Sequence, residues 1–87
     1  MAVTAARFTV STSAVALNTA GVAGGWLEVK NTSANAADLG PSSVTAGAGY
    51  DLAAGASADV FLAAGEVLYA IRSGAVDATL AVLRTGL

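Results

Sequence analysis

The chain has 87 residues, of which 55% are apolar and only 11% charged, and its net charge is −2. A chain of this length can build one hydrophobic core, so we expect a single domain over residues 1–87. Cysteine and histidine are absent from the sequence, which excludes a disulfide framework, a thiolate metal site and the commonest catalytic bases and nucleophiles.

Charged residues make up 11% of this chain, compared with roughly 25% of ordinary soluble domains. The exterior of the domain therefore has to be built largely from small, weakly polar residues. Alanine alone accounts for 22 residues. Such a surface loses little hydration free energy when it is buried against another molecule, so the composition favours association. Nucleic-acid binding is not expected, because the four cations lie far apart along the chain: Arg7, Lys30, Arg72 and Arg84.

Neither a secretory signal nor a membrane span is predicted in the first part of the sequence. Residues 1–7 lack a basic start followed by an apolar stretch, so we expect a protein that is made and used without export. Residues 8–27 carry no charge but are interrupted by serine, threonine, asparagine and glycine, which is unlike a membrane span.

Apolar residues alternate with polar ones at a period of two, and turn residues recur along the whole chain, which is typical of an all-β sandwich or barrel. Short strands are predicted at residues 7–10 and 15–17, before a loop over residues 18–25. An N-terminal arm over residues 1–12 is the alternative for the start of the chain. The clearest strand is predicted at residues 26–30.

This strand is expected to turn its Leu27 and Val29 side chains inward, because they share one face. Residues 31–35 predict a turn, since Asn and Ser side chains bond to nearby backbone. A returning strand at residues 36–39 would complete a hairpin, which the dipeptide at residues 40–41, Gly-Pro, would end.

The second half of the chain contains the tetrapeptide Leu-Ala-Ala-Gly twice, at residues 52–55 and 62–65. Each copy is predicted to end a strand in a glycine turn, with a further strand at residues 58–62 between the two. Just before them, Gly47 and Gly49 suggest a close approach of the backbone to another segment.

The longest strands of the second half are predicted at residues 67–72 and 78–84, joined as a hairpin by residues 73–77. Both faces of the last strand are partly apolar, which favours a central position in its sheet. The total is eight or nine short strands. We therefore expect an all-β fold, a single small β-sandwich or barrel with jelly-roll or Greek-key-like connectivity.

The remaining chemistry in the sequence consists of dispersed carboxylates, which we expect to be solvated charges at the rim of the domain. A paired-carboxylate mechanism needs two of them held together in a cleft, so we expect no enzyme activity and no cofactor. Calcium binding through Asp51 and Asp59 lacks the usual loop of ligands. The six carboxylates are Glu28, Asp38, Asp51, Asp59, Glu66 and Asp77.

Two further motifs have a structural and a functional interpretation. Residues 31–33, Asn-Thr-Ser, match a glycosylation sequon, but a plain turn is favoured for a protein that is not exported. Trp26 and Tyr50 could stack on a sugar ring, whereas such aromatic residues more often belong to a core or an interface.

Five segments of the chain have sequences typical of turns and strand ends: residues 29–35 (VKNTSAN), 39–45 (LGPSSVT), 49–55 (GYDLAAG), 67–71 (VLYAI) and 83–86 (LRTG). Together they resemble small virion proteins of tailed bacteriophages that accompany the head genes. The resemblance covers about residues 26 to 86, and the first 25 residues carry less of it. It implies a capsid decoration protein that sits on the outer shell as a homotrimer.

On this resemblance the expected partner is the phage major capsid protein, the expected location is the virion surface, and no catalytic residue is implied. The contacts with the shell or between protomers are expected in residues 7–10 and in the loop of residues 21–26. The candidate contact residues are Arg7, Phe8, Val10, Gly24 and Trp26. Two alternatives stay open: a head-fibre or tail module that binds a host glycan or receptor, and a structural component of the tail or connector.

Overall fold

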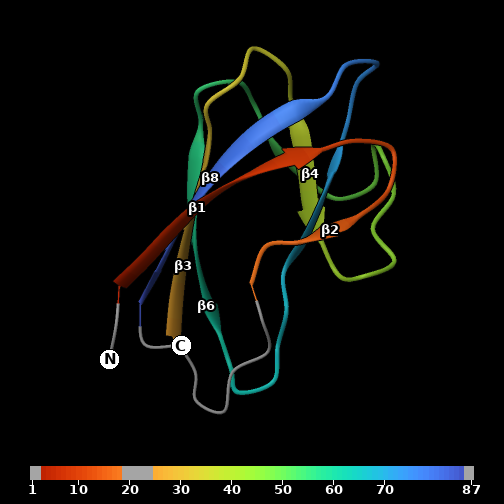
Figure 1. The fold of residues 1–87 in the computed structure, drawn as a ribbon. Helices are drawn as coiled ribbons and strands as arrows, with labels where there is room; N and C mark the ends of the chain where they lie inside the picture. The colour runs from red at the N-terminus through yellow and green to blue at the C-terminus, as the bar shows by residue number, and fades with distance from the viewer. Residues whose placement is uncertain (1–2, 19–24, 86–87) are drawn as a thin grey trace.

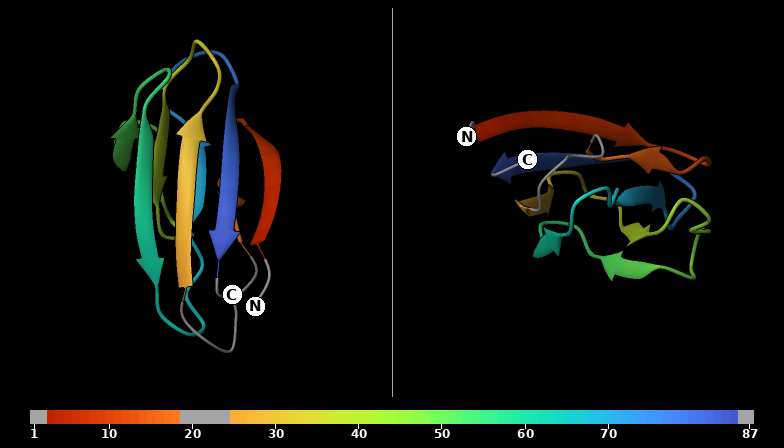
Figure 2. Two further views of the ribbon diagram at one scale, coloured as in Figure 1. Left: turned by 90° about the vertical axis from the view of Figure 1, so that its left-hand side faces the viewer. Right: turned by 90° about the horizontal axis from the view of Figure 1, so that it is seen from below.

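The computed structural model describes residues 3–18 and 25–85, and this part of the chain forms eight β-strands and no helix (Figure 1). The strands make two four-stranded antiparallel sheets, which lie against each other as two layers (Figure 2). In order, the strands are β1 (Val3–Val10), β2 (Val15–Ala16), β3 (Gly25–Asn31), β4 (Ala37–Gly40), β5 (Tyr50–Leu52), β6 (Ser57–Leu62), β7 (Tyr69–Arg72) and β8 (Ala78–Thr85).

We name the two layers sheet I, with the order β1-β8-β3-β6, and sheet II, with the order β2-β7-β4-β5. The pairing is nested: β1 pairs with β8, β2 with β7, β3 with β6 and β4 with β5. Of the described connections, only that between β4 and β5 joins neighbours in one sheet. The chain is thus a long antiparallel ribbon rolled into two layers, which is a jelly roll and confirms the predicted fold class.

Both predicted hairpins are wrong. β3 pairs with β6 and β8, whereas β4 pairs with β5 and β7, so residues 31–35 cross from one sheet to the other. Likewise β7 and β8 lie in different sheets. A connection of about five residues can span the roughly 10 Å between packed sheets as readily as it can close a hairpin. The alternation in the sequence specifies the faces of a strand, but not its neighbours.

The beginning of the chain belongs to the sheet. Residues 3–10 pair with β8 along their whole length, from Val3 opposite Thr85 to Val10 opposite Ala78. The predicted N-terminal arm is therefore not seen in the described residues, and the strand begins four positions before the predicted one. The last strand, β8, lies between β1 and β3, as its two apolar faces indicated.

The core lies between the two sheets and is made from the inward side chains of both. Leu27 and Val29 are fully buried, as predicted, and alternate with exposed residues along β3. Their neighbours on β8, Leu80 and Val82, are buried as well. The cluster comprises Val10, Leu17, Leu27, Val29, Ala37, Leu39, Leu52, Leu62, Ala70, Ala78, Leu80 and Val82.

The buried side chain of Asn31 stabilises the connection from β3 to β4, which crosses from sheet I to sheet II. The Asn31 amide nitrogen donates to the carbonyl oxygens of Asn35 at 2.7 Å and Leu52 at 3.0 Å. Its oxygen accepts from the amide and hydroxyl of Ser33. Since a buried polar group without partners is costly, this saturation explains how an asparagine is tolerated in the interior.

The outer face of sheet II is covered by the chain itself. The carboxylate of Asp38, which is buried, accepts hydrogen bonds from the amides of Gly47 at 2.6 Å and Gly49 at 3.4 Å. Val44, in the same loop, is buried too. Residues 41–49 thus fold back over β4, and Asp38 is not the solvated carboxylate that the sequence suggested.

Glycine has two distinct uses here. Gly55 and Gly65 have φ values of 78° and 83° and lie in turns closed by the amides of Ala56 and Glu66, which confirms the predicted turns after the repeated tetrapeptide. The predicted close approach holds for Gly49, where a Cβ atom would lie 2.7 Å from the Leu39 carbonyl oxygen.

We expect Gly49→Ala to lower the free energy of unfolding by about 2 kcal/mol, because the added methyl group overpacks the space beneath the loop. Urea denaturation followed by tryptophan fluorescence measures this change. Gly74→Ala is the matched control, since no atom lies within 4 Å of its Cβ position, and it should change the stability by less than about 0.5 kcal/mol. Equal losses in the two variants would contradict the close packing of Gly49.

Candidate interaction face

The outer face of sheet I carries three large exposed side chains, whereas the one on a strand of sheet II, Tyr50, lies on the edge strand β5. Trp26 is 55% exposed, Phe61 56% and Leu83 40%. These residues project from three neighbouring strands, β3, β6 and β8. We call this surface the open face; its outward residues include Ala5, Arg7, Thr9, Trp26, Glu28, Lys30, Ser57, Asp59, Phe61, Ala81 and Leu83.

The strand register arranges the open face in rows across the sheet. At one end, Trp26 lies opposite Phe61. In the next row, Glu28 lies between Leu83 on β8 and Asp59 on β6. The row after that holds the cations Arg7 and Lys30 on either side of Ala81. The face is therefore apolar at one end, and its two acids and two bases occupy adjacent rows.

The apolar end is held by an aromatic contact. The rings of Trp26 and Phe61 meet edge to face, with 5.5 Å between their centroids and an interplanar angle of 70°. This geometry stabilises a cross-strand pair by about 1 kcal/mol beyond the area that it buries. The contact orders two large side chains that stay more than half exposed, so they are ready to pack against a partner.

A shallow hollow lies over the middle of the open face. Its floor is formed by small side chains, Ala5 and Ala81, and longer side chains stand around it, among them Arg7, Glu28 and Lys30. The walls carry both charges, and the floor is apolar. This combination of an apolar floor and charged walls is suited to receive a side chain of a partner.

The structure divides the predicted contact residues into three groups. Arg7 and Trp26 lie on the open face. Phe8 is half-buried against the core, and the Val10 side chain is fully buried within this chain, so it does not belong to the open face. Gly24, with most of the predicted contact loop, lies outside the described residues.

Phe61, Leu83 and Asp59 belong to the open face but were missed by sequence reasoning. Exposed and buried residues alternate along β6, where Phe61 precedes buried Leu62. This alternation could have shown that the Phe61 side chain points outward. Its position beside Trp26 depends on the pairing of β3 with β6, which no local pattern specifies. Leu83 was recognised only as part of a second apolar face on the last strand.

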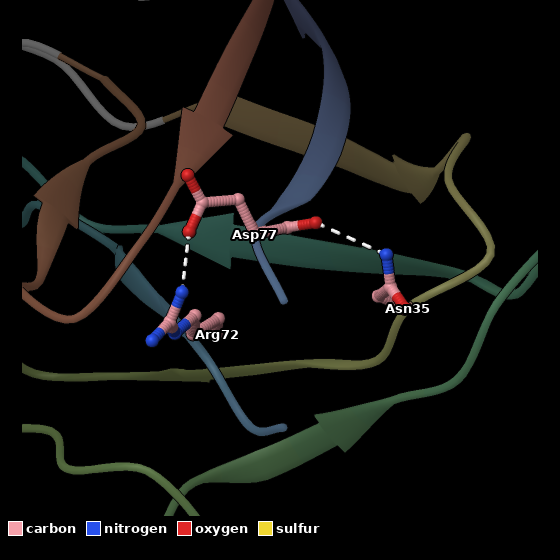
Figure 3. Close-up of polar contacts among 3 residues, drawn as sticks. All are labelled: Asn35, Arg72 and Asp77. Atoms are coloured by element: carbon pink, nitrogen blue, oxygen red, sulfur yellow. Dashed lines mark hydrogen bonds and ion pairs between the residues drawn. The ribbon is translucent and has the colours of Figure 1, made fainter. Parts of the chain in front are cut away.

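Two further carboxylates, Glu66 and Asp77, have structural partners. Glu66 accepts a hydrogen bond from the amide of Ala63 at 2.7 Å, within its own turn. Asp77 forms an ion pair with Arg72 at 2.7 Å, and its carbonyl oxygen accepts from the side chain of Asn35 (Figure 3). This group ties together two of the connections that cross between the sheets, those from β3 to β4 and from β7 to β8, and we find no chemical role for it.

The residues of the candidate calcium site and of the candidate sugar-binding pair lie on different sheets. Asp51 is on β5 of sheet II, whereas Asp59 is on β6 of sheet I, and no group of three possible metal ligands occurs in the described residues. Trp26 and Tyr50 also belong to different sheets. The Asn31 amide is buried and donates two hydrogen bonds, so the turn interpretation of the sequon is the one that the geometry supports.

In comparisons with known proteins, no protein-family model, no curated protein and no solved structure matches the chain. Within residues 3–18 and 25–85, no helix is present that could span a membrane. Any functional conclusion therefore depends on the open face and on the sequence itself.

We expect Trp26→Ala to lower the free energy of unfolding by about 1 kcal/mol, because most of this side chain is already in water. Its neighbour on the opposite face is the control: Leu27→Ala should cost about 3 kcal/mol, since it opens a cavity in the core. Thermal and urea unfolding of both variants test the assignment. A larger loss for Trp26 than for Leu27 would show that the faces of β3 are reversed.

Proposed function

We propose that this protein is a bacteriophage capsid decoration protein, which binds the outside of the assembled major-capsid shell as a homotrimer and stabilises it. The observation that supports this most is the open face, which carries two ordered, exposed aromatic side chains at its apolar end, on a domain whose other sheet is covered by its own loop. The resemblance of residues 26–86 to small head-associated virion proteins supplies the kind of partner.

The proposed action is binding linked to assembly. A protein that binds the expanded shell, and not its separate subunits, adds its binding free energy to the assembled state. Because the shell repeats the same site many times, a modest contact at each site suffices to stabilise the whole. The apolar end of the open face suits this task, because burying Trp26, Phe61 and Leu83 removes apolar area from water.

The test uses empty expanded shells of the phage whose genome encodes this chain. We expect the purified protein to bind these shells, to bind unexpanded shells weakly, and to raise the temperature at which the expanded shells break. Sedimentation measures the binding, and differential scanning calorimetry measures the stability.

The variant Trp26→Ser/Phe61→Ser should lose most of this binding, because it removes the apolar end of the open face. Val76→Ser is the control: this side chain is 57% exposed but lies on the connection between β7 and β8. The proposal fails if the wild-type protein leaves the shells unprotected. Glycan binding that is abolished by Trp26→Ala would instead favour the host-recognition alternative.

A further inference from the structure

Both edges of sheet I are free in the described structure. β1 pairs only with β8, and β6 pairs only with β3. β1 is eight residues long and contains neither proline nor lysine, which are common devices for keeping an edge strand unpaired. Such an edge presents a row of unpaired backbone donors and acceptors, and it invites another strand to extend the sheet.

We propose that β1 of one copy pairs with β6 of the next copy, so that sheet I continues from protomer to protomer. The four strands of sheet I are antiparallel neighbours in the order β1-β8-β3-β6, so β1 and β6 run in opposite directions. A second copy that continues the sheet therefore brings its β6 antiparallel to β1. This is the geometry that a pair of edge strands needs.

One register makes the two edges complementary in charge. Arg7 is exposed on the outer side of β1, and Asp59 is exposed on the outer side of β6. Placing them opposite each other forms an ion pair between copies. Opposite charges in such a cross-strand pair are stabilising, and like charges directly opposite are destabilising. A junction of β1 with β1 centred on the same residue would oppose two arginines instead.

The same register matches side-chain size on both faces of the junction. On the outer face, Ala5 falls opposite Phe61, so the small residue leaves room for the ring. On the inner face, Phe8 falls opposite Ala58, and Ala6 falls opposite Val60. Each large side chain thus meets a small one, which is the condition for close packing across two strands.

The edges also leave apolar groups incompletely covered. On the inward side of β1, Ala6 is exposed and Phe8 is half-buried. On the inward side of β6, Ala58 and Val60 are half-buried, and both line a hollow next to Leu68. A neighbouring strand at each edge removes this apolar area from water, which adds to the backbone hydrogen bonds.

Because two different edges meet, the contact is head to tail, and a closed ring forms when the rotation from one copy to the next closes. The number of three copies rests on the proposed function, whereas the pairing of β1 with β6 does not. In this arrangement the edge strands join the copies, and Trp26 and Leu83, which lie on the inner strands β3 and β8, stay outside the junction.

Charge reversal tests the pairing by analytical ultracentrifugation. We expect Arg7→Glu and Asp59→Arg each to weaken assembly by roughly tenfold per junction, through repulsion across the strands. The double variant Arg7→Glu/Asp59→Arg should restore it, because the pair is re-formed with its charges exchanged. Lys30→Glu is the control: the same change of charge on the inner strand β3 should leave assembly unchanged. Absence of rescue in the double variant would overturn the proposal.

A cysteine pair tests the register, since the chain has no cysteine of its own. In the proposed register Thr9 lies opposite Ser57 of the next copy, within reach of a disulfide. In one copy, two strands separate these positions, so Thr9→Cys/Ser57→Cys can cross-link only between chains. We expect covalent multimers under oxidation from the double variant, and chains that stay uncross-linked overturn the register. If multimers form but do not bind shells, only the decoration function fails.

Discussion

The pairing of the first half of the chain with the second, around the loop between β4 and β5, is the constraint on which the other features depend. It puts β8 and β3 in the middle of sheet I and leaves β1 and β6 at its edges. It also brings Trp26 beside Phe61, although these residues are far apart in sequence. The core, the open face and the free edges are all consequences of this nested arrangement.

The outer face of sheet II is covered and that of sheet I is not, and one carboxylate accounts for this difference. Asp38 holds the amides of Gly47 and Gly49, so the loop between β4 and β5 lies over the outer face of sheet II. Sheet I has no such cover, and it has to expose its outward aromatic residues. A domain with one closed and one open sheet has a defined side for association, which is what a protein needs to sit on a regular surface.

Local features were predictable from the sequence, and long-range ones were not. The alternation around Leu27 and Val29 identified the buried face of β3, and the repeated tetrapeptide identified the turns at Gly55 and Gly65. The partners of β3 were missed, because the turn at Asn31 is equally short for a hairpin and for a crossing between sheets. Asp38 resembled a surface charge, since its amide donors are supplied by residues nine and eleven positions away.

Amide hydrogen exchange measures the association of the protein through sheet I directly. The exchange of the wild-type protein should be compared between a dilute, dissociated sample and a concentrated, assembled one. The amides of β1 and β6 that point away from the sheet at its two edges should exchange more slowly on assembly, while the exchange of residues 41–49 stays unchanged. Unchanged exchange in β1 and β6, with slowing confined to residues 41–49, would contradict this prediction and would assign association to sheet II.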